Sequence, residues 1–241
     1  ITIAAQDIGS TAFDWFLITA DADAVPGNIQ CTVTMTAGTD EYPYQEQETI
    51  NLDLTLSQFG FPLDGIVVKS SPIVADLNSD GVKEIYFGSD NEALHGYNSF
   101  GEEIAGFPFQ STDRVRSSPA VGDVDNDGQM EIVFGNSSGK LYIVNHDGSQ
   151  QLAYSILGFI EGSPALVDVD GDQDLEIIFN TTTTSGGKLY AIHHNGITMS
   201  GFPKELGSMW TGPAVHDIDN DGAYDIVCTT YDKEVYAVNI D

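Results

Sequence analysis

The chain has 241 residues and a formal net charge of −29, with 37 acidic and 8 basic side chains. This length allows one large domain or two small ones. So acidic a surface excludes nucleic acid as a partner, because phosphates require basic groups, and it disfavours anionic membrane surfaces. No stretch approaches the roughly 20 apolar residues of a membrane-spanning helix, so membrane insertion is not expected.

Residues 1–55 form the first predicted domain. Three stretches, 13–18, 29–36 and 48–56, have the β-branched and aromatic composition of strands, and residues 24–28 have that of a turn. The pattern predicts an immunoglobulin-like β segment, although a complete sandwich of this kind has roughly 100 residues. The remaining strands could be lost, unnecessary or supplied by a partner, so the segment is a candidate for assembly.

Residues 56–241 form the second predicted domain, in which one order of parts recurs four times. The repeats lie near residues 64–105, 106–153, 154–200 and 201–241. In each, a short apolar strand, an acidic loop, a second strand and a variable loop lead to a third strand, and in the first three repeats a turn and a fourth strand follow. A fixed period of this size predicts a repeat architecture, and four antiparallel strands per repeat predict a blade of a β-propeller. The predicted fold class is therefore all-β.

The acidic loop has the spacing of a calcium site. Calcium takes six to eight oxygen ligands at about 2.3–2.6 Å. Side chains at positions 1, 3 and 5 of a tight loop can supply them, with the carbonyl of position 7 and a carboxylate at position 9. Glycine at position 6 permits the positive φ of the turn. A strand follows position 9, whereas an EF-hand closes at position 12 and continues as a helix.

These positions give up to four structural Ca²⁺ ions. The candidate ligands are Asp76, Asn78, Asp80, Val82 and Glu84 in loop one; Asp123, Asp125, Asp127, Gln129 and Glu131 in loop two; Asp168, Asp170, Asp172, Asp174 and Glu176 in loop three; and Asp217, Asp219, Asp221, Ala223 and Asp225 in loop four. Loop three has Gln173 at position 6, and its glycine, Gly171, falls two residues earlier. Positive φ at a non-glycine residue costs about 1 kcal/mol, so we expect loop three to bind most weakly or to turn differently.

Three runs of the second repeat carry a resemblance to a known family. They are Ser-Pro-Ala-Val-x-Asp-Val-Asp-x-Asp-Gly at 118–128, Glu-Ile-Val-Phe-Gly at 131–135 and Lys-Leu-Tyr-x-Val-Asn at 140–145. They resemble the FG-GAP or VCBS repeats of integrin α-chain propellers and of many secreted bacterial proteins, over about residues 59–241. The resemblance implies calcium in the loops between the first and second strands. It also implies seven blades, which leaves a larger propeller as an alternative to a ring of four.

The ends of the repeat region bear on that choice. Repeat four stops at residues 239–241, where its hairpin turn should begin, and residues 56–63 have the composition of an outer strand. If this segment completes repeat four, the ring closes and no strand edge is left open. We therefore favour a closed four-bladed ring over part of a larger propeller.

The sequence gives little evidence for catalysis, for a histidine metal site or for a disulfide. No catalytic constellation or nucleotide-binding motif occurs, so an enzyme is not expected. His193 and His194 are adjacent at a strand end and point in opposite directions, which makes them a poor metal pair. Cys31 and Cys228 have the setting of buried apolar residues and not of a disulfide.

A candidate ligand face lies opposite the calcium loops. Its residues precede the first strands of the repeats and are Lys69, Arg114, Arg116, Glu161 and Trp210. Arginine and tryptophan are typical of binding hot spots. The alternative is scattered charge around the mouth of a channel.

The sequence thus predicts an extracellular or cell-surface calcium-binding propeller that acts in binding, adhesion or scaffolding. The expected partner is a protein or a glycan. Two alternatives remain open: the substrate-binding accessory region of a secreted hydrolase or polysaccharide lyase, and a structural subunit of a cell-surface assembly.

Overall fold

The computed structural model describes residues 27–39, 42–54, 58 and 60–240. It divides the chain into two compact units, Ile1–Gln58 and Phe59–Asp241. None of the described residues belongs to a helix that could cross a membrane.

The described part of the first unit is one antiparallel hairpin. Strand β1 (Gly27–Thr39) pairs with β2 (Tyr42–Leu54) over its whole length. An immunoglobulin-like sandwich needs two sheets packed face to face, and the described residues of this unit form a single two-stranded sheet. The immunoglobulin-like prediction is therefore not supported, and its strand at 13–18 lies outside the described residues.

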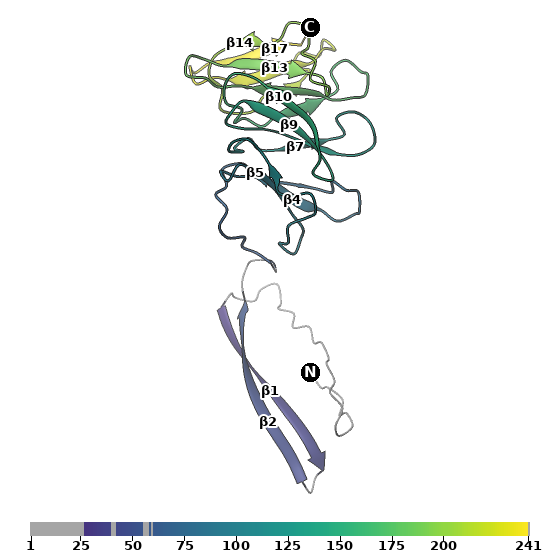
Figure 1. The fold of residues 1–241 in the computed structure, drawn as a ribbon, viewed down its shortest axis with the longest axis vertical. Coiled ribbons are helices and arrows are strands. Elements are labelled where there is room, and N and C mark those ends of the chain that lie inside the picture. Colours follow the sequence, from purple (N-terminus) through teal and green to yellow (C-terminus); the bar gives the residue numbers. More distant parts are fainter. Residues whose placement is uncertain (1–26, 40–41, 55–57, 59, 241) are drawn as a thin grey trace. The chain divides into compact units, whose positions relative to one another are not determined.

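The second unit consists of four antiparallel sheets that follow one another along the chain as propeller-like blades (Figure 1). Blade one has β3 (Ile73–Ala75), β4 (Glu84–Gly88), β5 (Ala93–Tyr97) and β6 (Phe109–Gln110); blade two has β7 (Ala120–Gly122), β8 (Glu131–Gly135), β9 (Lys140–Asn145) and β10 (Gln150–Ser155); blade three has β11 (Ala165–Val167), β12 (Glu176–Asn180), β13 (Lys188–Ile192) and β14 (Lys204–Glu205); blade four has β15 (Ala214–His216), β16 (Asp225–Thr229) and β17 (Val235–Asn239). The prediction of four repeats of all-β structure is confirmed.

The blades pack face to face through their middle strands. Ile132, Val133 and Phe134 of β8 are all fully buried, because both faces of this strand meet a neighbouring sheet. The Phe134 ring stacks on Tyr142 at 5.3 Å and joins a core cluster with Leu94 of blade one. A strand covered on both sides needs a continuous apolar run, which is what the second strands of these repeats have.

The outermost strands differ from the prediction. In blades one and three, a Gly-Phe-Pro run at 106–108 and 201–203 interrupts the fourth strand, and only two residues pair beyond it. Proline lacks the N–H that a ladder requires, so pairing cannot run through this tripeptide. Blade two lacks the tripeptide, and its β10 has six residues with one register shift.

The predicted ring closure is not found among the described residues. Blade four has three strands there, and residues 60–63 form no strand, whereas residues 56, 57 and 59 of the predicted closing segment lie outside the described residues. The backbone of Gly60 instead packs on blade one, where a Cβ added to Gly60 would stand 1.6 Å from the Phe100 carbonyl oxygen. The blades form an open fan, and its two ends expose apolar side chains, with Val74 58 % and Val235 72 % accessible.

Glycine sets the spacing at one junction of the fan. A Cβ added to Gly106 would lie 2.0 Å from the Asp147 carbonyl oxygen, so blades one and two meet there backbone to backbone. A Cβ added to Gly196, in the corresponding turn of blade three, would lie 3.5–3.6 Å from the side chains of Leu152 and Tyr154 of blade two. Side chains therefore fill the equivalent space between blades two and three.

Candidate metal centres

The four acidic loops occupy the same place in each blade, between its first and second strands. The closing acids are Glu84, Glu131, Glu176 and Asp225, the first residues of β4, β8, β12 and β16. Each loop therefore ends on a strand that is fixed by the core of its blade.

Two residues with left-handed backbone shape every loop. Position 4 has positive φ at Ser79, Asn126, Gly171 and Asn220, and position 6 has it at Gly81, Gly128, Gln173 and Gly222. The expected positive φ of Gln173 is confirmed at 83°. Gly171 is not misplaced, because it occupies the other left-handed position, where loops two and four have asparagine. Asparagine tolerates this conformation better than most residues. The asparagines at position 4 of loops two and four therefore indicate, in the sequence itself, that this position has positive φ.

The first aspartate of each loop organises the turn by accepting backbone N–H groups. In loop two, Asp127 N and Gly128 N donate to the two carboxylate oxygens of Asp123 at 3.0 and 2.9 Å. Gln129 N donates to Asp127 Oδ1 at 2.8 Å. Loops one and four have the same three hydrogen bonds. These bonds hold the carboxylates toward the inside of the loop.

The carboxylates converge as the spacing predicts. Carboxylate oxygens of positions 1, 3 and 5 lie within 4.8 Å of one another in loops two, three and four, as the groups Asp123, Asp125 and Asp127; Asp168, Asp170 and Asp172; and Asp217, Asp219 and Asp221. Loop one has Asn78 at position 3, which supplies an amide in place of the third carboxylate. In loop two, Asp125 Oδ1 is buried without a hydrogen-bond partner among the described residues. An unpaired oxygen beside two other carboxylates fits a hard cation.

The closing acids are the buried part of each site. Their exposed fractions are 3 % for Glu84, 2 % for Glu131, 0 % for Glu176 and 6 % for Asp225. Each accepts the N–H of the position 2 residue, as Val124 N donates to Glu131 Oε2 at 2.9 Å. The pKa of Glu131 is raised to about 7, chiefly by burial and also by the neighbouring aspartates, against the opposing effect of the Val124 N–H. A divalent cation would remove the cost of burying this charge, so the donor set fits calcium.

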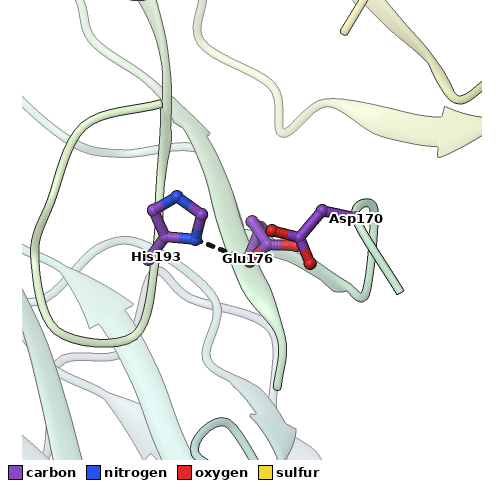
Figure 2. A group of neighbouring side chains, drawn as sticks. All are labelled: Asp170, Glu176 and His193. Carbon is purple, nitrogen blue, oxygen red and sulfur yellow. Dashed lines mark hydrogen bonds and ion pairs between the residues drawn. The ribbon is translucent and has the colours of Figure 1, made fainter. Parts of the chain in front are cut away.

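Loop three has neighbours that the other loops lack. His193 Nδ1 lies 2.9 Å from Glu176 Oε1, and His194 Nδ1 lies 2.8 Å from Asp174 Oδ2. Figure 2 shows the His193 ring directed at Glu176, with the Asp170 carboxylate beside it. The two adjacent histidines thus each meet a different acid of the same loop.

The predicted ligand face is tied into ion pairs. Arg116 Nε lies 2.7 Å from Asp90 Oδ1, and Arg116 Nη1 lies 3.7 Å from Glu161 Oε1. Lys69 Nζ lies 3.5 Å from Asp90 Oδ2. The Arg116 guanidinium lowers the pKa of the Asp90 carboxyl. Arg116 thus links blades one and three, while Trp210 is 52 % exposed.

A pocket that sequence reasoning missed lies on the same side of the blades. It measures about 250 Å³ and is lined by Ser137, Ser138, Gly158, Phe159, Thr183 and Thr184. Two backbone hydrogen bonds hold its floor, from Phe159 N to Thr182 O at 2.8 Å and from Thr182 N to Phe159 O at 2.9 Å. Asn136 fixes another wall by accepting the N–H groups of Ser138 and Lys140. Thr183 and Thr184 come from the loop between β12 and β13, so this loop forms part of the pocket wall.

The fold and the loops together define a propeller-like module, part of which matches a known repeat family. The profile of the FG-GAP-like repeat matches residues 76–134 and 123–179. Among solved structures, the V. cholerae biofilm matrix protein Bap1 is similar with a TM-score of 0.51 at 19 % identity, over 70 % of this chain and 30 % of Bap1. BBS1N, from a complex with ARL6DN soaked with lead, is similar with a TM-score of 0.54 at 13 % identity, over 73 % of this chain and 52 % of BBS1N.

This chain spans from under a third to about half of the length of these two proteins. No functionally curated protein matches the sequence. At these identities the similarity shows the fold alone.

Proposed function

We propose that this chain is an extracellular, calcium-stabilised binding module without catalytic activity, and that its ligand enters the pocket between blades two and three. The pocket is the observation that carries the proposal. An extracellular setting is supported by all-oxygen calcium loops, which suit the high calcium concentrations found outside cells. It is also supported by the structural neighbour Bap1, which is a biofilm matrix protein.

The pocket lining favours a glycan with uncharged sugar rings. Four of its six lining residues are serine or threonine, whose hydroxyl groups can both donate and accept hydrogen bonds. The Phe159 side chain is 42 % exposed and gives an apolar surface for a sugar face, and the neighbouring Leu157 is 89 % exposed. Binding pockets commonly combine such an aromatic surface with a few polar groups that fix orientation.

A glycan array probed in millimolar calcium would identify the ligand, and calorimetric titration of the best glycan would then test the site. Phe159→Ala should weaken binding at least tenfold, because it removes the apolar wall. Phe100→Ala is the matched control, since Phe100 is 60 % exposed and lies outside the pocket. Absence of any glycan ligand, or equal affinity of the Phe159→Ala variant, would refute the proposal.

A second candidate function is that of a structural subunit in a surface assembly. It is favoured by the apolar side chains at the open ends of the fan, where Tyr231 is 79 % and Val235 is 72 % exposed. Exposed apolar surface of this kind marks interaction sites in soluble proteins. Sedimentation at several protein concentrations distinguishes the two functions, because a subunit should self-associate and a simple binding module should remain monomeric.

A further inference from the structure

The third repeat differs from the others at one position facing the closing acid. On the neighbouring strand, Asn145 stands opposite Glu131 and Asn239 stands opposite Asp225. Repeat one has Asn98 at the equivalent position, and repeat three has His193. The repeats themselves therefore provide a comparison, in which asparagine occurs three times and histidine once.

The exchange changes what this side chain contacts. Asn98 Oδ1 accepts the Phe100 N–H at 2.9 Å, and Asn145 Nδ2 donates to Ser149 Oγ at 2.9 Å, so both asparagines bond to their own turn. His193 instead reaches across the sheet to Glu176. In repeat three, histidine replaces this asparagine, and its side chain contacts the closing acid and not its own turn.

Three donor atoms of different chemistry meet at this point. One atom each from Asp170, Glu176 and His193 lie within 4.8 Å of one another, and Figure 2 shows them as one group. His193 Nδ1 and Glu176 Oε1 are 2.9 Å apart. Two donors bound to one zinc ion at about 2.0–2.1 Å with tetrahedral angles lie roughly 3.3 Å apart. The pair therefore already has nearly the spacing of two ligands of one ion.

The second histidine, His194, has a different partner. His194 Nδ1 lies 2.8 Å from Asp174 Oδ2, while Asp174 Oδ1 has no hydrogen-bond partner among the described residues. Asp174 belongs to a separate group with Asp172 and Glu176, whose carboxylate oxygens lie within 4.8 Å of one another. Of the two adjacent histidines, His193 is therefore the one that shares a group with Glu176 and Asp170.

We propose that loop three binds a transition-metal ion of the zinc type through Asp170, Glu176 and His193. Calcium prefers oxygen ligands, whereas imidazole nitrogen suits zinc and its neighbours in the periodic table. Glu176 is fully buried, and its other oxygen is held by the Val169 N–H at 2.9 Å, so its position is fixed before the metal arrives. The loop that lacks the position 6 glycine thus selects a different metal from the other three.

Titration of Zn²⁺ into the calcium-saturated full chain tests the proposal by calorimetry, and Co²⁺ absorption reports nitrogen ligation. The wild type should bind one equivalent of zinc, and the cobalt-loaded protein should show the visible bands of a nitrogen-containing site. His193→Asn restores the residue of the other repeats and should lose at least tenfold in zinc affinity together with these bands. His146→Asn, at the end of β9 in blade two, is the control and should bind zinc as the wild type does.

Equal zinc affinity of the wild type and the His193→Asn variant would overturn the proposal, as would the absence of zinc binding in excess calcium. Asp170→Asn is a second variant that keeps the contact between His193 and Glu176, and it should also weaken zinc binding at least tenfold. The glycan pocket contains none of these residues, so failure of the zinc site leaves the proposed binding function to its own test.

Discussion

Replacing Glu131 by glutamine should change the stability of this protein in opposite directions with and without calcium. Glu131 is 2 % exposed and accepts the Val124 N–H at 2.9 Å. A glutamine carbonyl can accept the same hydrogen bond, so the substitution removes the charge and keeps the shape. The free energy of unfolding then reports what the charge contributes in each condition.

The magnitude follows from the pKa of Glu131. Burial raises it from the usual 4.5 to about 7 in the metal-free protein, and this difference corresponds to roughly 3 kcal/mol. Because the folded-state pKa is the higher one, the contribution is fully present below about pH 4.5 and is lost as the pH rises through about 7. At pH 8 without metal, Glu131→Gln should therefore raise the free energy of unfolding by about 1–3 kcal/mol.

With calcium bound the sign should reverse. An ion at thousandfold excess over its Kd stabilises the folded state by about 4.1 kcal/mol per site. Loss of a closing carboxylate removes most of this gain, and the loss exceeds the stability that removal of the buried charge adds. Melting temperatures at pH 8, in chelator and in millimolar calcium, measure both effects at roughly 2–4 °C per kcal/mol for a domain of this size. Glu92→Gln, at an exposed glutamate outside the loops, is the control and should change neither. If Glu131→Gln is less stable than the wild type to the same extent in both conditions, calcium does not bind at this carboxylate.

Three further predictions concern the loops and the core. Gln173→Gly should raise stability by up to about 1 kcal/mol in a denaturant titration, because φ at this residue is 83°; a loss of stability would show that the Gln173 side chain matters more than its backbone. A fragment of residues 59–241 should melt cooperatively and at a higher temperature in calcium, since this unit has its own core; aggregation of the purified fragment would contradict the division of the chain between residues 58 and 59. Phe134→Ala should cost about 3–5 kcal/mol because its ring is fully buried, whereas Phe100→Ala should change stability by less than about 0.5 kcal/mol, and similar costs would refute the assignment of the core.

The calcium loops could be predicted from the sequence because their geometry is local. Alternating acids from Asp123 to Asp127 converge through hydrogen bonds between residues at most five positions apart. The second strands were equally clear, because a strand buried on both faces requires an uninterrupted apolar run such as residues 132–134. In both cases the determining contacts lie within one repeat.

Other features depend on contacts between distant parts of the chain. The ring closure depends on contacts between the two ends of the repeat region, and the outer-strand composition of residues 56–63 did not reveal that Gly60 packs on blade one. The metal potential of His193 was missed because its partner, Glu176, is a cross-strand neighbour 17 residues away. Comparison of the four repeats would have shown it, since asparagine stands at this position in the other three.

The contrast between the blade junctions has a mechanical consequence. Blades one and two touch through backbone at Gly106, so their separation is fixed and any added side chain would force them apart. Blades two and three are held apart by Leu152 and Tyr154, which can change rotamer and yield under load. Replacement of Gly106 by a larger residue should therefore disturb the packing of the blades more than the same replacement at Gly196.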